Sequence, residues 1–304
     1  MGLYMALVAM GLIALLAGGD LLVRGAVGLA QRFGMSPMLI GLTLVGFGTS
    51  MPELLTSVQA ALTGASGIAL GNVVGSNIAN ILLVLGLAAV IAPFAAQVER
   101  DVWIMGAVSL LCAGIILGGQ IGFVTGAVLV GLLALYLIVA LRGGGPAEMP
   151  IDPPISRGKG VLVSAVGLAL LLIGARALVS GAVGLASGLG VSQTVIGVTV
   201  VAIGTSLPEL VTSVIAARKG QSALALGNVI GSNIFNVLGI LGVTALVTPI
   251  AVPDAMAGLH LWVMLFAAAG LIAVMAVFGR IGRASGLAAL GVYAIYLAWS
   301  AVAG

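Results

Sequence analysis

The residues best suited to chemistry lie in two copies of one motif. Residues 48–80 read GTSMPELLTSVQAALTGASGIALGNVVGSNIAN, and residues 204–236 read GTSLPELVTSVIAARKGQSALALGNVIGSNIFN. Each copy holds a glutamate after a proline, Glu53 or Glu209, and then a series of Asn and Ser side chains. Carboxylates inside otherwise apolar stretches are costly, so both motifs are candidates for a functional site.

The first part of each motif offers oxygen ligands for a cation. A proline inside a helix lacks its own N–H and frees the carbonyl four residues back, here that of Gly48 or Gly204. Oxygen donors of this kind suit Ca²⁺, Mg²⁺ or Na⁺ far better than soft metals. The hydroxyl and carboxylate groups beside the two breaks belong to Thr49, Ser50 and Glu53, and to Thr205, Ser206 and Glu209.

The second part of each motif adds amide and hydroxyl oxygens. Asn72, Ser76 and Asn80 are spaced four residues apart, which places them on one face of a helix. Asn228, Ser232 and Asn236 repeat this spacing in the second copy. Together the motifs supply two carboxylates, which balance one divalent or two monovalent cations. The alternative is that these polar groups only join helices by hydrogen bonds, but the duplicated glutamate favours a cation site.

The composition places these motifs in a membrane. The chain has 304 residues, 62% hydrophobic and 6% charged, whereas soluble domains carry roughly 25% charged residues. Its continuous apolar runs do not alternate as the strands of an outer-membrane barrel do. We therefore predict an all-α polytopic membrane protein with ten transmembrane helices of about 20 residues or more. The expected spans are 3–31, 36–61, 68–92, 102–118, 122–141, 160–186, 193–217, 223–248, 259–278 and 284–302.

The basic residues predict how the chain is oriented. Nine of the eleven Lys and Arg residues fall between spans or at span ends, and all nine lie in odd-numbered connections. Cytoplasmic loops are enriched in Lys and Arg, so we expect both termini outside. The expected location is the plasma (inner) membrane. The nine residues are Arg32, Arg100, Arg142, Arg157, Lys159, Arg218, Lys219, Arg280 and Arg283.

The two halves of the chain are predicted to be inverted copies of each other. Adding 156 to a residue number aligns them without a gap, and 23 of the 33 motif positions are identical. Five spans per half is an odd number, so the second copy enters the membrane from the opposite side. Transporters built this way place their sites near the membrane midplane. The expected units are a first repeat at 1–141, a cytoplasmic linker at 142–159 and a second repeat at 160–304.

GTSxPE followed by GNVxGSN, present twice, resembles the two repeats of the cation/calcium exchanger superfamily. The Na⁺/Ca²⁺ exchanger branch in its compact prokaryotic form is the most similar. The resemblance covers nearly the whole chain and implies ten helices, with the cation sites formed by the second, third, seventh and eighth. It also implies that the first and sixth spans slide past the motif helices during transport.

The resemblance assigns a ligand set to this sequence. The implied ligands are the carboxylates of Glu53 and Glu209, the hydroxyls of Ser50, Ser76, Ser206 and Ser232, the backbone carbonyls of Thr49 and Thr205, and the amide of Asn80. Some prokaryotic members carry Asp where this chain has Asn236, as does the K⁺-dependent branch, so the neutral amide argues against K⁺ co-transport. GNVVGSN and GNVIGSN replace the GNAAEH-like motif of H⁺/Ca²⁺ exchangers, which disfavours proton coupling.

These features predict a secondary active antiporter that exchanges Na⁺ for Ca²⁺ by alternating access and is electrogenic. The alternatives are an H⁺/Ca²⁺ or other divalent cation exchanger, a cation channel, and a membrane-embedded metal hydrolase that uses Glu53 and Glu209 as acid and base. We expect no enzymatic activity, no cofactor, and no nucleic acid or protein partner. Ca²⁺, Na⁺ and the lipid bilayer are the expected partners of a monomer. Asp20 and Arg24, spaced four residues apart, are expected to pair.

Overall fold

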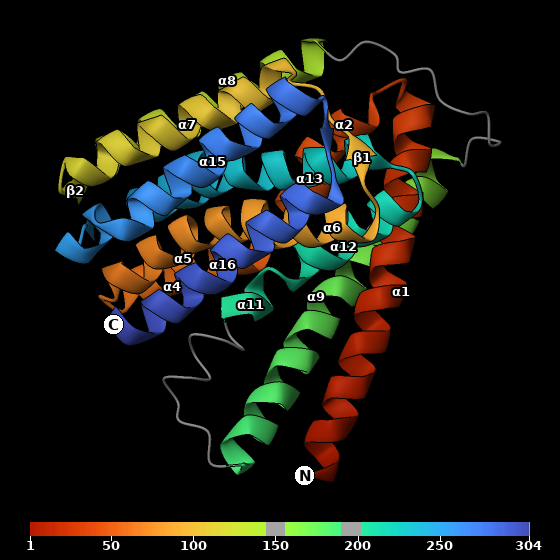
Figure 1. Ribbon diagram of the computed structural model, residues 1–304, viewed down its shortest axis with the longest axis horizontal. Helices are drawn as coiled ribbons and strands as arrows, with labels where there is room; N and C mark the ends of the chain where they lie inside the picture. The colour runs from red at the N-terminus through yellow and green to blue at the C-terminus, as the bar shows by residue number, and fades with distance from the viewer. Residues whose placement is uncertain (144–155, 190–201, 304) are drawn as a thin grey trace.

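The protein is mostly helical in the computed structural model, which describes residues 1–143, 156–189 and 202–303 (Figure 1). The first half contains α1 (Gly2–Phe33), α2 (Pro37–Ile40), the π-helix η1 (Gly41–Val45), α3 (Gly46–Thr49), α4 (Met51–Leu62), α5 (Ser66–Ala79), the π-helix η2 (Asn80–Leu85), α6 (Gly86–Ile91), β1 (Phe94–Ala95), α7 (Arg100–Leu117), β2 (Gln120–Ile121) and α8 (Phe123–Gly143). The second half contains α9 (Arg157–Gly188), α11 (Ala202–Thr205), α12 (Leu207–Arg218), α13 (Ser222–Phe235), the π-helix η4 (Asn236–Leu241), α14 (Gly242–Val247), β3 (Ile250–Ala251), the 3-10 helix η5 (Asp254–Ala257), α15 (Leu259–Phe278), β4 (Arg280–Ile281) and α16 (Arg283–Ala303).

Several of these helices can cross a membrane. Among the described residues, seven are long and apolar enough, and the bent pair Pro37–Thr49 and Met51–Leu62 makes an eighth. A helical membrane protein is therefore confirmed, whereas ten spans in two inverted repeats stay a prediction. Part of the expected seventh span, residues 193–201, lies outside the described ranges.

Helix α9 begins earlier than expected, at Arg157 and not at 160. Ser156 explains the earlier start, because its Oγ accepts a hydrogen bond from the backbone N–H of Lys159 at 3.4 Å and caps the helix. Helix α8 runs on to Gly143, so helical residues occupy both ends of the predicted linker.

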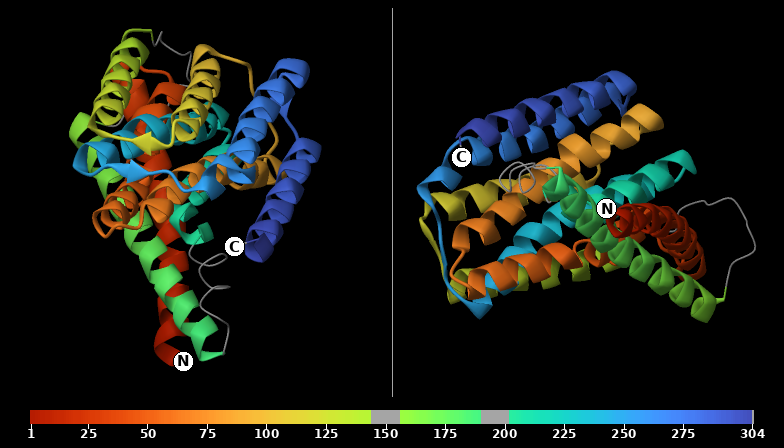
Figure 2. Two further views of the ribbon diagram at one scale, coloured as in Figure 1. Left: turned by 90° about the vertical axis from the view of Figure 1, so that its left-hand side faces the viewer. Right: turned by 90° about the horizontal axis from the view of Figure 1, so that it is seen from below.

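Helices α1 and α9 lie side by side and extend together away from the other helices (Figures 1 and 2). Glycines line their contact at intervals of seven residues. A Cβ added to Gly18 would lie 2.7 Å from the carbonyl oxygen of Gly167, so no larger residue fits there. Small residues allow membrane helices to pack this closely. The glycines are Gly11, Gly18 and Gly25 of α1 and Gly167, Gly174 and Gly181 of α9.

Two short antiparallel strand pairs connect loops of the first half to loops of the second. In one pair β1 lies against β4, with Phe94 opposite Ile281; in the other β2 lies against β3, with Gln120 opposite Ala251. The sequence numbering puts β1 and β4 in odd-numbered connections and β2 and β3 in even-numbered ones. Loops expected on the same side of the membrane therefore pair with each other.

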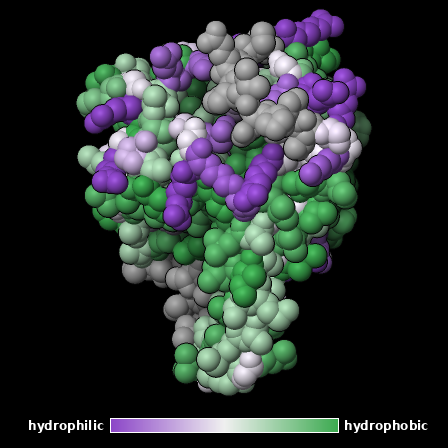
Figure 3. All heavy atoms as spheres, turned by 90° about the vertical axis from the view of Figure 1, so that its right-hand side faces the viewer, coloured by the Kyte–Doolittle hydropathy of each residue, from purple (hydrophilic) through white to green (hydrophobic). Residues whose placement is uncertain are grey.

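The surface separates hydrophilic from hydrophobic regions. In Figure 3 the hydrophilic residues gather over the upper part of one face, and the projecting α1–α9 pair below it is mainly hydrophobic. Large apolar side chains such as Leu3, Ile13 and Ile173 are exposed on these two helices. This distribution suits contact with lipid, as the composition predicts.

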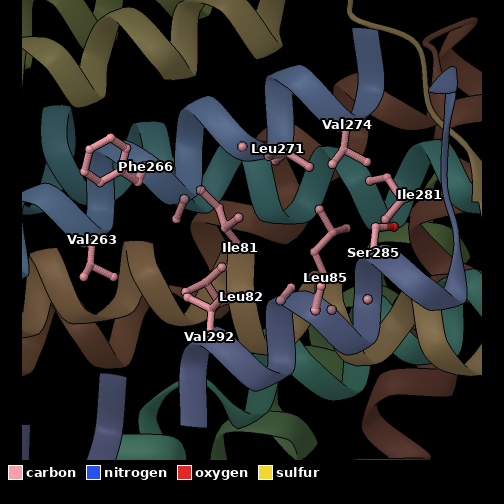
Figure 4. Close-up of a pocket in the computed structure, with 16 residues that line it drawn as sticks. Ile81, Leu82, Leu85, Val263, Phe266, Leu271, Val274, Ile281, Ser285 and Val292 are labelled. Atoms are coloured by element: carbon pink, nitrogen blue, oxygen red, sulfur yellow. The ribbon is translucent and has the colours of Figure 1, made fainter. Parts of the chain in front are cut away.

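An apolar pocket of about 430 Å³ opens between η2, α15 and α16 (Figure 4). Leu82 and Leu85 of η2, Leu271 of α15 and Val292 of α16 line it. Ser285 supplies the one polar side chain among its lining residues. Because a cation needs several oxygen donors, this pocket is not the candidate site.

Candidate cation-binding site

Each Gly-Thr-Ser-x-Pro-Glu segment interrupts a helix, as the sequence predicts. Helix α3 ends at Thr49, α4 begins at Met51, and the two segments are bent by 44°. Pro52 lies in the first turn of α4, where its missing N–H costs no hydrogen bond. In the second copy α11 ends at Thr205 and α12 begins at Leu207. The breaks place both glutamates in the first turn of a new helix, whose dipole favours a negative charge.

An unpredicted π-helix begins at the end of each motif. Helix α5 changes to the π-helix η2 at Asn80, and α13 changes to the π-helix η4 at Asn236. π-Helical turns are rare and occur frequently at functional sites. Both predicted amide ligands therefore lie where the helix widens.

The structure buries both glutamates and brings the two motifs into contact. Glu53 and Glu209 are each 1% exposed. Ser50 of the first motif donates a hydrogen bond from Oγ to Oε1 of Glu209 in the second, at 2.9 Å. The carboxylates of Glu53 and Glu209 are close enough to interact electrostatically. The meeting of two acidic groups from distant parts of the chain is the central expectation from the sequence.

Neither glutamate has a positively charged partner in the described part of the chain. The ion pairs there are Arg24 Nε to Asp20 Oδ2 at 2.7 Å, Lys219 to Asp20, and Arg100 to Asp101 at 3.4 Å. The predicted pair of Asp20 and Arg24 is thus confirmed, and Lys219 joins it. The negative charge of Glu53 and Glu209 remains available to a bound cation.

Asn72 and Asn228 hold the two parts of each motif together. Asn72 Nδ2 donates to the backbone carbonyl of Glu53 at 3.0 Å and to Ser57 Oγ at 2.8 Å. Asn228 Nδ2 donates to the carbonyl of Glu209 at 3.3 Å and to Ser213 Oγ at 2.9 Å. These amides fix the first turn that carries each glutamate.

Hydroxyl groups make further contacts between the two motifs. Ser232 Oγ donates to the carbonyl of Gly46 at 3.3 Å. Thr49 Oγ1 donates to the carbonyl of Val45 at 3.0 Å and lies 3.3 Å from Asn228 Oδ1. The break between α3 and α4 is therefore packed against α13, the motif helix of the other half.

Several oxygens of the site are buried and without a hydrogen-bond partner within the described ranges. Leaving a buried acceptor unpaired costs about 1–3 kcal/mol, so a cluster of them needs a compensating ligand. Five of the nine unpaired buried atoms belong to predicted ligand residues. They are Glu53 Oε2, Glu209 Oε2, Asn80 Oδ1, Asn236 Oδ1 and Ser206 Oγ.

The remaining predicted ligands lie close to this cluster in the chain. Ser76 is buried on α5, one turn before Asn80. Thr205 ends α11 and is half-buried. No group of three His, Cys, Asp or Glu side chains that could hold a metal occurs in the residues described. The donor set is thus one of carboxylate, amide and hydroxyl oxygens, which suits Na⁺ or Ca²⁺.

Asn77 and Asn233, which were not among the predicted ligands, are buried beside them. Asn77 Oδ1 accepts a hydrogen bond from Asn236, and Asn233 Oδ1 accepts one from Asn80. Both lie in the repeated Gly-Ser-Asn segment, so the duplication itself was the signal that could have identified them.

A cavity of about 380 Å³ lies beside the two motifs, where Pro52 and Pro208 are among its lining residues. It lies between α4 and α9 and is lined by Leu55, Gln59, Ala175 and Thr205 among others. The residues that align with Ala175, Leu55 and Gln59 at an offset of 156 are Gly19, Val211 and Ile215. These are in contact, because a Cβ on Gly19 would lie 2.7 Å from Ile215 and 2.9 Å from Val211.

Arg176 also lines this cavity. It aligns with Asp20 at the same offset. Asp20 lies where α1 is packed against α12, here called the closed side, and it pairs there with Lys219 from the end of α12. The closed side therefore has an ion pair between α1 and the α12–α13 loop that the aligned residues Arg176 and Thr63 cannot form.

Comparison with known proteins agrees with this geometry. A family model described as sodium/calcium exchanger protein matches residues 3–142 and 159–302. The chain is 38% identical over 289 residues to the putative antiporter CaxA of Alkalimonas amylolytica, covering 91% of each chain. It is 34% identical over 259 residues to the inner membrane protein YrbG of Escherichia coli, covering 80% of each.

The fold is similar to that of a solved transporter. The sodium-calcium exchanger NCX_Mj, in a structure soaked with 2.5 mM Na⁺ and 0.1 mM Ca²⁺, matches with a TM-score of 0.85 and 35% identity. The match covers 97% of this chain and 98% of that one. The likeness therefore extends over both motifs and over the helices around them.

Proposed function

Because the chain belongs to the sodium/calcium exchanger protein family, we propose that it exchanges Na⁺ for Ca²⁺ across the membrane by alternating access. The observation that carries this proposal is the pair of buried glutamates, Glu53 and Glu209, which lack a basic partner among the described residues. Around them lie unpaired amide and hydroxyl oxygens. Ca²⁺ and Na⁺ are the substrates that this donor set fits.

The charge of the site couples the two ions. Two carboxylates in a dry, buried centre need compensating positive charge before the surrounding helices close over them, since an uncompensated buried charge is very costly. One Ca²⁺ or a set of Na⁺ ions supplies that charge, but the two cannot occupy the same oxygens together. Mutual exclusion at Glu53 and Glu209 therefore exchanges one ion for the other.

The difference between the two sides of the site supports alternating access. Equivalent residues are in contact where α1 meets α12, yet line a cavity of about 380 Å³ where α9 faces α4. A chain with inverted repeats reaches its opposite state when the two sides exchange these arrangements. The close-packed α1–α9 pair is the element that would slide as a unit.

The proposal also includes the orientation, the location, the ligand set and the oligomeric state of the protein. The charged loops place both termini outside, and the name of the relative YrbG supports an inner-membrane location. The ligands we propose are those of the sequence analysis: Thr49, Ser50, Glu53, Ser76, Asn80, Thr205, Ser206, Glu209, Ser232 and Asn236. A monomer suffices, because the glutamates and unpaired oxygens of the site all come from one chain.

The proposal is tested by ⁴⁵Ca²⁺ uptake into proteoliposomes loaded with Na⁺, with K⁺ or with acid. We expect accumulation with Na⁺ inside and none with K⁺ or acid inside. Replacing Glu53→Gln or Glu209→Gln removes one carboxylate with little change in shape, so uptake should fall to the level of protein-free vesicles. The variants should remain monodisperse in detergent, which separates lost transport from lost folding.

Each alternative function gives a different result. Uptake driven by internal acid without Na⁺ indicates an H⁺/Ca²⁺ exchanger. Ca²⁺ entry that equilibrates but never accumulates against its gradient indicates a channel. Retained Na⁺-driven uptake in Glu53→Gln would rule out the proposed site.

A further inference from the structure

Four buried asparagines form two crossed hydrogen-bonded pairs between the halves of the chain. Asn80 Nδ2 donates to Asn233 Oδ1 at 3.1 Å, and Asn236 Nδ2 donates to Asn77 Oδ1 at 3.0 Å. Each side chain is at most 2% exposed. Adding 156 to Asn77 and Asn80 gives Asn233 and Asn236, so the two pairs are equivalent.

The outer end of each pair meets a methionine sulfur. Asn233 Nδ2 donates to Met105 Sδ at 3.6 Å, and Asn77 Nδ2 donates to Met264 Sδ at 3.9 Å. Met105 of α7 and Met264 of α15 are fully buried. A thioether accepts hydrogen bonds weakly and donates none. The amide nitrogen, and not the oxygen, therefore faces the sulfur in both cases.

The inner end of each pair is an unpaired oxygen. Asn80 Oδ1 and Asn236 Oδ1 are buried and have no partner in the part of the chain that the structure describes. If the Asn80 amide turned over, its oxygen would face the oxygen of Asn233, and its N–H would face the site. Two amide oxygens in contact repel each other, and an N–H that faces the site repels a cation. The orientation of the Asn233 amide therefore decides that of the Asn80 amide.

We infer that Met105 and Met264 are positioning residues for the transported cation, each acting through one asparagine on the next. The two hydrogen-bonded chains of residues, called the chains in this subsection, are Met105–Asn233–Asn80 and Met264–Asn77–Asn236. This inference rests on the proposed function, since it assumes that Asn80 and Asn236 face the ion. The methionine sulfur fixes the orientation of the first asparagine amide, and that amide fixes the orientation of the second. The oxygen of the second amide then faces the cation.

The geometry explains why thioethers serve in this place. A hydroxyl or amide at position 105 or 264 both donates and accepts, so it would stabilise either orientation of the neighbouring asparagine. An aliphatic side chain would stabilise neither. A buried acceptor that cannot donate selects one orientation. Because a cation binds oxygen and not N–H, that selection keeps Asn80 and Asn236 competent to bind.

The test replaces Met105→Leu and Met264→Leu, singly and together, in the full-length protein. Leucine conserves volume and apolarity, so packing is largely retained, but it accepts no hydrogen bond. Met275→Leu is the matched control, because Met275 is equally buried on α15 and has no assigned part in either chain. Na⁺-driven ⁴⁵Ca²⁺ uptake gives KM and maximal rate, and thermal unfolding is measured with and without Ca²⁺.

We expect each single substitution to raise the KM for Ca²⁺ about 2- to 3-fold, the lower end of the effect of one hydrogen bond, because a thioether is a weak acceptor. The maximal rate should stay near that of Met275→Leu. The double substitution should show roughly the product of the two increases, because the chains share no residue. Unfolding temperature without Ca²⁺ should fall slightly below that of the control, because each substitution leaves one buried amide N–H unpaired. The increase produced by a fixed Ca²⁺ concentration should also shrink, since stabilisation follows affinity.

The inference is overturned if Met105→Leu and Met264→Leu both keep the KM of Met275→Leu. It is equally overturned if they only lower the unfolding temperature in the absence of Ca²⁺, which is the result for a purely structural role. Should one variant fail to fold, the other tests its own chain independently. Absence of Ca²⁺ uptake by the unsubstituted protein would instead reject the proposed function.

Discussion

At the residue scale, the asparagines of the two motifs have different tasks. Asn72 and Asn228 give their N–H groups to the carbonyls of Glu53 and Glu209, so they hold the helix starts that carry the carboxylates. Asn80 and Asn236 instead keep a buried oxygen without a partner among the described residues. A shared side-chain type thus supports the site at one position and faces it at another.

Replacing Asn228→Ala should therefore destabilise the protein more than it changes ion selectivity. The substitution removes the contact with Thr49 Oγ1 and the two hydrogen bonds that Nδ2 donates, which leaves the carbonyl of Glu209 and Ser213 Oγ without this donor. We expect a loss of about 1–3 kcal/mol in the free energy of unfolding, measured as a lower unfolding temperature in ion-free detergent solution. Gln59→Ala, at an exposed position of α4, serves as the control. Equal unfolding temperatures for the two variants would contradict this role.

The candidate ligands could be predicted from the sequence, whereas the residues that hold them in position could not. Glu53 and Glu209 are recognisable because a carboxylate in an apolar run is rare and this one occurs twice. Met105 and Met264 are not recognisable in this way. They are 159 residues apart and not 156, so the gap-free alignment does not match them. Methionine in a membrane helix is also unremarkable until the direction of its sulfur is known.

At the element scale, two kinds of helix irregularity shape the site. The breaks at Ser50 and Ser206 follow from proline and were predictable. The π-helices at Asn80 and Asn236 were not, because an additional residue per turn depends on packing against neighbouring helices and leaves no local sequence pattern. The strand pairs β1–β4 and β2–β3 were unforeseen for a similar reason, since each strand has only two residues.

Cysteines introduced into α4 and α12 should react at different rates, because α4 faces a cavity whereas α12 is packed against α1. In a Cys112→Ala background, Gln59→Cys lies in the cavity between α4 and α9, whereas Ile215→Cys is packed against Gly19. A membrane-impermeant thiol reagent should label the first variant much faster than the second in the detergent-solubilised protein. Denatured samples, in which both cysteines are accessible, give the control. Similar labelling rates in the folded state would show that the two sides do not differ.

At the scale of the whole molecule, the charge moved in each cycle decides how the membrane potential acts. If more than two Na⁺ leave a vesicle for each Ca²⁺ that enters, net positive charge leaves the lumen. A lumen-positive potential should then increase Ca²⁺ accumulation, and a lumen-negative potential should decrease it. One net charge corresponds to about tenfold in the accumulation ratio for each ~60 mV.

This dependence is measured by ⁴⁵Ca²⁺ uptake with potentials set by K⁺ gradients and valinomycin. High external K⁺ gives the lumen-positive condition. Vesicles containing Glu53→Gln control for passive leakage of Ca²⁺. Accumulation that does not change with potential would indicate exchange of two Na⁺ for one Ca²⁺, and electrogenic transport would be rejected.

The overall architecture follows from the sequence to different degrees. Hydrophobic runs of membrane length identify most of the helices, because lipid requires every spanning backbone to be hydrogen-bonded within its own segment. Sequence identity at a fixed offset predicts the internal duplication. Hydrophobicity says nothing, however, about which side of the site is open, since both arrangements of α1 and α9 satisfy the same pattern.

The contacts between the halves also affect how the protein is made. Asn80 in the first half donates a hydrogen bond to Asn233 in the second, and β1 pairs with β4. A ribosome therefore releases the first five expected spans into the membrane long before the residues that complete their polar contacts have been synthesised. During that interval the nascent half must shelter buried amides and carboxylates from lipid by other means, which makes the insertion machinery, or a transient arrangement of the helices, a participant in building the site.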